Sequence, residues 1–353
     1  MSGDGCAVIL FHRKSAYLSV IMMVSDLVFL LMNHWEQYHR VGPPSGWNKD
    51  GIAAAEGFSS WTISEKKLAA DRMEGSLRSL TDHMNGRMAE MMSLPEGKSF
   101  IDEEGRISMR MFMQERGGKL SEEAIIADER YIYEKKTDVI ARSPGTLRYF
   151  GGVESAYRHM EESRRSRDGE LGEKAFFYVM NRLLGRRYLV LRTSIYDDLE
   201  NKADFLIVDL KKWKCGPFVV DMLVNDAQEH SREALLSRKK EILSGREGNH
   251  VKYGVSRLKE GGVSRCGLDG LPGIVIPVGL KAIKSFYDDL AADRPFDAEP
   301  TDAEWRLFEY AITSFADHLP RNEDLMTEKS IPLLEFLQLA QNRLENIRPS
   351  AFS

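Results

Sequence analysis

Two aspartates stand among apolar residues at a spacing that would let them act together. They lie in the stretch ADFLIVDLKKWKCGPFVVDML, residues 203–223, which reads as two strands joined by a short basic turn. A turn symmetric about Lys212 and Trp213 places Asp204 directly opposite Asp221 on one face of the hairpin. Facing Cβ atoms lie about 4.5 to 5.5 Å apart, and like charges in that position destabilise the strand pair. We therefore expect a further group that offsets this repulsion.

A divalent cation held between the two carboxylates is the functional interpretation. Mg²⁺ takes a few carboxylates together with waters and phosphate oxygens, which suits cleavage of a phosphodiester. A shared proton or a neighbouring lysine or arginine would also relieve the repulsion. The simpler interpretation is that one aspartate ends a strand in solvent, since a shift of one residue in register would separate the two faces.

The elements around this hairpin predict an α/β module over residues 152–290. A helix at 169–185 precedes a β-rich run at 186–196, and the hairpin follows. After it come an amphipathic helix at 226–243, a flexible glycine-rich connection that includes GGVSRCGLDG, and an apolar strand at 273–280. Both faces of the hairpin are mostly apolar, so we expect its strands inside a sheet that is covered on both sides by helices.

The run from Glu173 to Val224 resembles the core of the PD-(D/E)XK nuclease superfamily. Members of that family have a helix with an acidic residue, a strand, and a hairpin whose first strand begins with Asp and whose second carries D/E-x-K. Glu173 matches the helix acid, with Glu170 as a second candidate, Asp204 matches the first strand, and Asp221 matches the third motif. The resemblance implies a restriction-endonuclease-like mixed sheet flanked by helices. It also implies Mg²⁺ or Mn²⁺ bound by the matched carboxylates, and a nucleic-acid substrate, DNA in preference to RNA.

One position departs from the family pattern. Leu223 stands where the third motif has lysine, and leucine can neither orient a water nor stabilise charge on a phosphate. Lys202 is the first candidate for a replacement, because the same register would place it opposite Leu223, although it could equally relieve the charge of Asp204 or be a solvated turn residue. Lys239 or Lys240 on the following helix is the other candidate.

The resulting hypothesis is a divalent-metal-dependent nuclease whose activity the leucine at the lysine position could impair. Its predicted catalytic residues are Asp204, Asp221 and Lys202, and its predicted metal ligands are Glu173, Asp204 and Asp221. The alternative is a catalytically inactive module of the same type that binds nucleic acid or protein. Arg192, which is unusual inside a predicted strand, is expected to pair with the acidic site.

Composition and charge set only wide bounds. With 353 residues, 42% hydrophobic and 29% charged, the chain is globular and not disordered. A formal net charge of −5 gives no global signal for nucleic-acid binding, and only residues 161–260 carry a positive excess, with 20 basic against 17 acidic residues. The three cysteines match neither a disulfide framework nor a zinc site, which favours a reducing cytoplasm.

Further segments flank the predicted module on both sides. Residues 1–60 hold an apolar segment and a linker, 61–151 read as mainly helical, and 291–353 as a helical extension. The apolar segment 17–32 is shorter than the roughly 20 residues of a spanning helix and contains Asp26, so a buried or partner-facing helix is the favoured interpretation. A membrane anchor and a signal peptide remain alternatives.

Overall fold

The structure is a computed structural model that describes residues 61–94, 98–114, 119–212, 216–225, 249–291, 294–318 and 331–345. These residues belong to one compact unit. Within these ranges, no helix combines the length and the apolar character needed to cross a bilayer. The predictions for segment 17–32, for the helix at 226–243 and for Lys239 and Lys240 lie outside the described residues.

The centre of the fold is a mixed four-stranded sheet in the order β1-β2-β3-β6. Strand β2 runs antiparallel to both β1 and β3, whereas β6 runs parallel to β3. Strand β6 therefore has to be reached by a crossover, as in other parallel pairs. The predicted α/β class is confirmed. The strands are β1 (Tyr188–Arg192), β2 (Phe205–Asp209), β3 (Phe218–Asn225) and β6 (Gly273–Gly279).

The register of the hairpin is the predicted one. Phe205 pairs with Val220 and Ile207 pairs with Phe218, which is the symmetry expected for a turn about residues 212 and 213. All residues of β1 and β2 are buried, as expected for strands in the interior of a sheet. The expected position of the turn was therefore sufficient to predict the pairing of β2 with β3.

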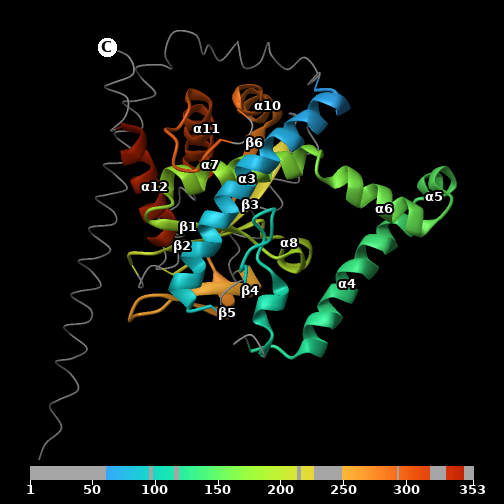
Figure 1. Cartoon of the computed structure of the whole chain (residues 1–353), viewed down its shortest axis with the longest axis horizontal. Coiled ribbons are helices and arrows are strands. Elements are labelled where there is room, and N and C mark those ends of the chain that lie inside the picture. The colour runs from blue at the N-terminus through green and yellow to red at the C-terminus, as the bar shows by residue number, and fades with distance from the viewer. Residues whose placement is uncertain are drawn as a thin grey trace, which may run out of the picture. The chain divides into compact units, whose positions relative to one another are not determined.

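Helices from three parts of the chain cover one face of this sheet. Phe205 of β2 packs on Phe176 of helix α7 with ring centroids 4.7 Å apart. Phe218 of β3, which shares that face through the register, packs on Phe315 of helix α11 and Phe336 of helix α12. The arrangement is visible in Figure 1. The helices after residue 152 are α6 (Val153–Arg164), α7 (Asp168–Leu184), α8 (Ile195–Asn201), α10 (Leu280–Asp289), α11 (Asp302–His318) and α12 (Ile331–Glu345).

Two elements of the module differ from the prediction. The β-rich run predicted over 186–196 ends at Arg192, and residues 195–201 form helix α8, because Ser194 caps the helix by accepting the backbone N–H of Asp197. The prediction of a flexible glycine-rich connection is also wrong. Part of that segment forms β5 (Val263–Leu271), which pairs with β4 (Asn249–Arg257) in a separate two-stranded sheet.

The region before the module is mainly helical, as predicted. Its first helix is capped by Thr62 and Glu65 in a reciprocal capping box. This helix packs on α7 and α10, so it belongs to the same core as the sheet. The elements of this region are α3 (Ile63–Met92), the short 3₁₀ helix η1 (Met109–Phe112), α4 (Glu122–Ala141) and α5 (Pro144–Phe150).

Candidate functional site

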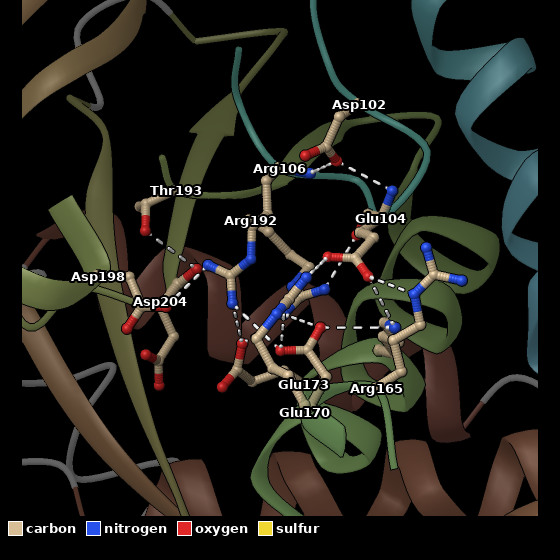
Figure 2. Close-up of polar contacts among 12 residues, drawn as sticks. Asp102, Glu104, Arg106, Arg165, Glu170, Glu173, Arg192, Thr193, Asp198 and Asp204 are labelled. Atoms are coloured by element: carbon tan, nitrogen blue, oxygen red, sulfur yellow. Dashed lines mark hydrogen bonds and ion pairs between the residues drawn. The ribbon is translucent and has the colours of Figure 1, made fainter. Parts of the chain in front are cut away.

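Three carboxylates from separate elements converge at the end of the central strands. Glu173 lies on α7, Asp198 on α8, and Asp204 directly before β2. One oxygen from each lies within 4.8 Å of the other two. Figure 2 shows these three side chains beside a network of arginines and further acids. We call Glu173, Asp198 and Asp204 the carboxylate trio.

Asp204 is the most deeply placed member of the trio. Its side chain accepts the backbone N–H of Met222 at 2.6 Å, which fixes its position against β3. Burial and then the charges of Glu173, Asp198 and Asp221 raise the pKa of Asp204 well above its usual range. A buried carboxyl in this setting is stabilised either by a proton or by a cation.

Asp198 is held in place by its neighbour Asp197. Asp197 is fully buried and accepts four hydrogen bonds, two of which come from the backbone N–H groups of Lys252 and Tyr253 on β4, at 2.7 and 3.1 Å. The other two come from Ser194 and Asn201, at 2.8 and 2.7 Å. Asp197 therefore fastens α8 to the small sheet.

We expect Asp197→Ala to lower the free energy of unfolding by about 2 to 3 kcal/mol, because it leaves buried donors unsatisfied. Urea denaturation measures this loss. The matched control is Asp288→Ala on the exposed surface of α10, which should stay within about 0.5 kcal/mol of the wild type. Wild-type stability of Asp197→Ala would refute the anchoring role.

Two buried arginines donate hydrogen bonds to carboxylates of the trio. Arg106 donates to Asp198 at 2.8 Å and to Glu173 at 3.0 Å. Arg192, at the end of β1 and fully buried, donates to Glu173 at 2.6 Å and to Glu170 at 2.8 Å. The prediction that Arg192 pairs with the acidic site is therefore confirmed.

Arg106 comes from a turn that precedes the module. Asp102 accepts the backbone N–H groups of Glu104 and Arg106, which closes a turn around Glu104 and Gly105. Gly105 has a φ of +81°, and a Cβ atom there would collide with the ring of Phe177 on α7. The turn can therefore lie close to α7 and bring Arg106 to the carboxylates.

Glu170 lies beside the trio and is surrounded by four cationic side chains. Burial opposes its ionised form, yet the surrounding cations hold the pKa of Glu170 well below its usual range. Glu173, in contrast, has a raised pKa, because its burial and the charges of Asp198 and Glu170 outweigh the two arginines. Glu170 therefore acts as a permanent counter-ion. The cations around it are Arg106, Arg164, Lys174 and Arg192, at 3.5, 3.0, 3.5 and 2.8 Å.

The structure brings some of the predicted site residues together and leaves others apart. Glu173 and Asp204 meet in the trio, whereas among the described residues Asp221 does not join it. The ladder of β2 with β3 ends at the pair Phe205 and Val220, and the backbone N–H of Asp204 donates to the carbonyl of Val220, so the predicted pairing of Asp204 with Asp221 is not part of it. The predicted cross-strand position of Lys202 opposite Leu223 is wrong. Lys202 instead ends α8 in a left-handed conformation with a φ of 51°, three residues before β2 begins.

The trio has a size and composition that fit a hard divalent cation. Oxygen ligands lie about 2.0 to 2.1 Å from Mg²⁺, so two ligands on opposite sides of the ion are about 4.2 Å apart. Adjacent ligands of an octahedral ion lie about 3 Å apart, so the oxygens of the trio, which lie within 4.8 Å of one another, would have to move closer by rotation of their side chains. The side chain of Asp198 is 32% exposed, which leaves the trio open to solvent on the side of α8.

Asp198 was missed by sequence reasoning, although a signal for its helix was present. Ser194 and Asp197 have the spacing of an S-x-x-D capping motif, which marks the start of a helix. Comparison with known proteins assigns no function to this geometry: no protein-family model, no curated protein and no solved structure matches the chain.

Proposed function

We propose that this chain is a divalent-metal-dependent nuclease of the restriction-endonuclease-like type. The observation that carries the proposal is the convergence of Glu173, Asp198 and Asp204 within 4.8 Å. Two of these residues are the helix acid and the strand acid that the family resemblance assigns as metal ligands. The third, Asp198, adds a carboxylate that the motif does not contain.

The order of elements supports the same proposal. Helix α7, the antiparallel strands β1 to β3 and the parallel strand β6 follow the sequence of helix, strand and hairpin that the resemblance implies. The acidic residues also occupy the corresponding places, with Glu173 on the helix, Asp204 before the first hairpin strand and Asp221 on the second. The specific fold assignment is part of the proposal.

The residues of the trio would hold Mg²⁺ or Mn²⁺ and share its coordination with the substrate phosphate. A bound ion supplies a polarised phosphoryl oxygen and a water of lowered pKa. The backbone N–H of Met222 orients Asp204, and Arg106 orients Glu173 and Asp198 toward each other. Leu223, paired with Pro277 in the sheet, has no titratable group, and Lys202 ends α8 instead of facing Leu223, so the proposal assigns no amine to this position.

The proposal is tested with the full chain after removal of metal ions. We expect MnCl₂ and MgCl₂ to raise the midpoint of thermal unfolding, since an ion at a hundred times its dissociation constant stabilises the folded state by about 2.7 kcal/mol. Labelled single-stranded DNA, supercoiled plasmid and RNA, incubated with either ion, should yield cleavage products that EDTA suppresses. If the ions neither raise the unfolding midpoint nor support cleavage, the nuclease proposal is wrong.

A second candidate is a module of this type that has lost catalysis. The specific observation in its favour is that Arg106 and Arg192 already contact Glu173, so that internal cations offset part of the negative charge. The substitution of lysine by Leu223 points in the same direction. For this candidate we expect nucleic-acid binding that is unchanged by EDTA, together with no cleavage under any metal condition.

A further inference from the structure

Helices α4, α5 and α6 form a helical arm, defined as residues 122–164. Helix α4 packs on α6, and the short helix α5 packs on both of them. Tyr133 on α4 donates to Glu154 on α6 at 2.9 Å, and Lys136 pairs with Glu161 at 2.9 Å. Figure 1 shows α4 and α6 inclined to each other and converging near α5, at the end that is remote from the sheet. The arm is therefore an ordered projection.

The base of the arm is joined to the candidate site at both of its helices. On α4, Tyr131 bonds to Glu200 of α8, the helix that carries Asp198. At the end of α6, Arg164 pairs with Glu170 at 3.0 Å, and the chain then continues directly into α7 with Glu173. A ligand bound along the arm would thus lie on elements that are continuous with the carboxylate trio.

The tip of the arm, residues 139–153, combines arginines with exposed aromatic and apolar groups. Residues 139–153 contain Arg142 and Arg148 and no aspartate or glutamate. Tyr149 is 82% exposed, and its ring rests edge-on against Phe150 with centroids 4.8 Å apart. No residue of α5 is buried, and the side chains of Arg148 and Tyr149 are exposed to a partner.

The charge of the tip is free to act on a partner. The side chain of Arg142 is 83% exposed, and the nearest carboxylate is that of Asp138 at 3.9 Å, an exposed pair that contributes little. Arg148 is likewise exposed. Two arginines beside an open tyrosine ring offer ion pairs to phosphates and a face on which a base can stack.

We propose that the tip of the arm binds single-stranded nucleic acid and guides it toward the carboxylate trio. Tyr149 stacks on an unpaired base, and Arg142 and Arg148 pair with the flanking phosphates. Unpaired bases are required because the ring of Tyr149 can reach a base face only where the bases are not stacked in a duplex. This inference names the substrate form for the proposed nuclease and rests on that function only for the final direction of the strand.

The test measures binding of a fluorescein-labelled single-stranded DNA of mixed sequence by anisotropy, with EDTA present so that no cleavage occurs. We expect Tyr149→Ala to weaken binding by about fivefold or more, as loss of one stacked base does. For Arg142→Gln/Arg148→Gln, the slope of log K against log salt should fall by about 1.4, the value for two lost phosphate contacts on a single strand. The duplex of the same sequence should bind more weakly.

The matched control removes two exposed arginines from other helices. Arg78 on α3 and Arg306 on α11 are 66% and 54% exposed, and Arg78→Gln/Arg306→Gln should keep the wild-type affinity and salt slope. Equal losses in control and tip variants, or wild-type binding in the tip variants, would overturn the inference.

Cleavage in Mn²⁺ is then measured for the tip variants and for Asp204→Asn, which changes a residue of the trio. If only Asp204→Asn loses cleavage and the tip variants still bind DNA, the nuclease proposal holds and the proposal for the arm fails. If the tip variants lose binding and the wild type shows no metal-dependent cleavage, the proposal for the arm holds and the nuclease proposal fails.

Discussion

Asp204→Asn is expected to lower metal-dependent cleavage by at least about 100-fold, the scale on which loss of a metal-site or charge-stabilising group acts. The residue is only 7% exposed, and its side chain lies beside the two further carboxylates of the trio. Asparagine keeps an oxygen that can accept the N–H of Met222, so the local fold is preserved while one negative charge is removed. Cleavage of labelled DNA in Mn²⁺ measures the effect.

The same substitution is expected to stabilise the protein when no metal is present. The pKa of Asp204 is raised on folding, so its contribution to stability is fully present below the unfolded pKa near 3.8 and is lost as the pH rises through the folded pKa. The asparagine side chain of the variant cannot ionise and avoids this loss. Above the folded pKa we therefore expect Asp204→Asn to be more stable than the metal-free wild type by about 1 to 3 kcal/mol, the cost of an uncompensated buried group.

Asp209 supplies a matched control at the other end of the same strand. It is also buried, but its carboxylate pairs with Arg187 at 2.9 Å and accepts the backbone N–H of Lys211 at 2.7 Å. Asp209→Asn should therefore lose stability and keep metal-dependent cleavage. If Asp204→Asn instead loses stability at every pH and retains cleavage, Asp204 is a structural carboxylate and the proposed centre is wrong.

The sheet was predictable because its information is local. The position of a short turn between two apolar runs predicts the pairing of Phe205 with Val220, because each step away from the turn along one strand is matched by a step along the other. Buried strands and the helix with Glu173 were likewise visible as continuous apolar runs.

The other half of the site depends on contacts between segments that are far apart in the chain. Arg106 reaches Glu173 only because the turn at Gly105 lies against Phe177, and no spacing rule links that turn to α7. Asp198 was missed for a different reason: α8 has only seven residues, too few for a helical period to stand out. The extrapolated strand that placed Lys202 opposite Leu223 failed at the same helix.

Arg192→Met is expected to cause the largest loss of stability, about 3 to 5 kcal/mol, as the removal of one partner from a buried ion pair does. Arg192 is fully buried and contacts Glu170, Glu173 and the backbone carbonyl of Glu104, at 2.8, 2.6 and 3.0 Å. Methionine fills a similar volume but leaves the two carboxylates without this cation. Urea denaturation at neutral pH measures the loss.

The loss should depend on pH, because Arg192 lowers the pKa of Glu170. A carboxylate with a depressed pKa contributes stability above its unfolded pKa, near 4.5, and this stability disappears as the pH falls through the folded pKa. The difference between wild type and Arg192→Met should therefore be larger at about pH 8 than at about pH 4. The control is Arg187→Met, whose side chain is 20% exposed and pairs with Asp209, and which should cost less.

Addition of Mn²⁺ to Arg192→Met separates the two functional candidates. In the variant, Glu173 has lost one of its cations, and a metal bound by the trio would place positive charge beside it. Mn²⁺ should therefore restore part of the lost stability of the variant, and it should stabilise the variant more than it stabilises the wild type. In an inactive module, the arginines would take the place of the ion permanently. Mn²⁺ should then change the stability of neither the variant nor the wild type. The size of the Mn²⁺ effect in the variant relative to the wild type thus reports whether Arg192 only orders an ion site or has taken its place.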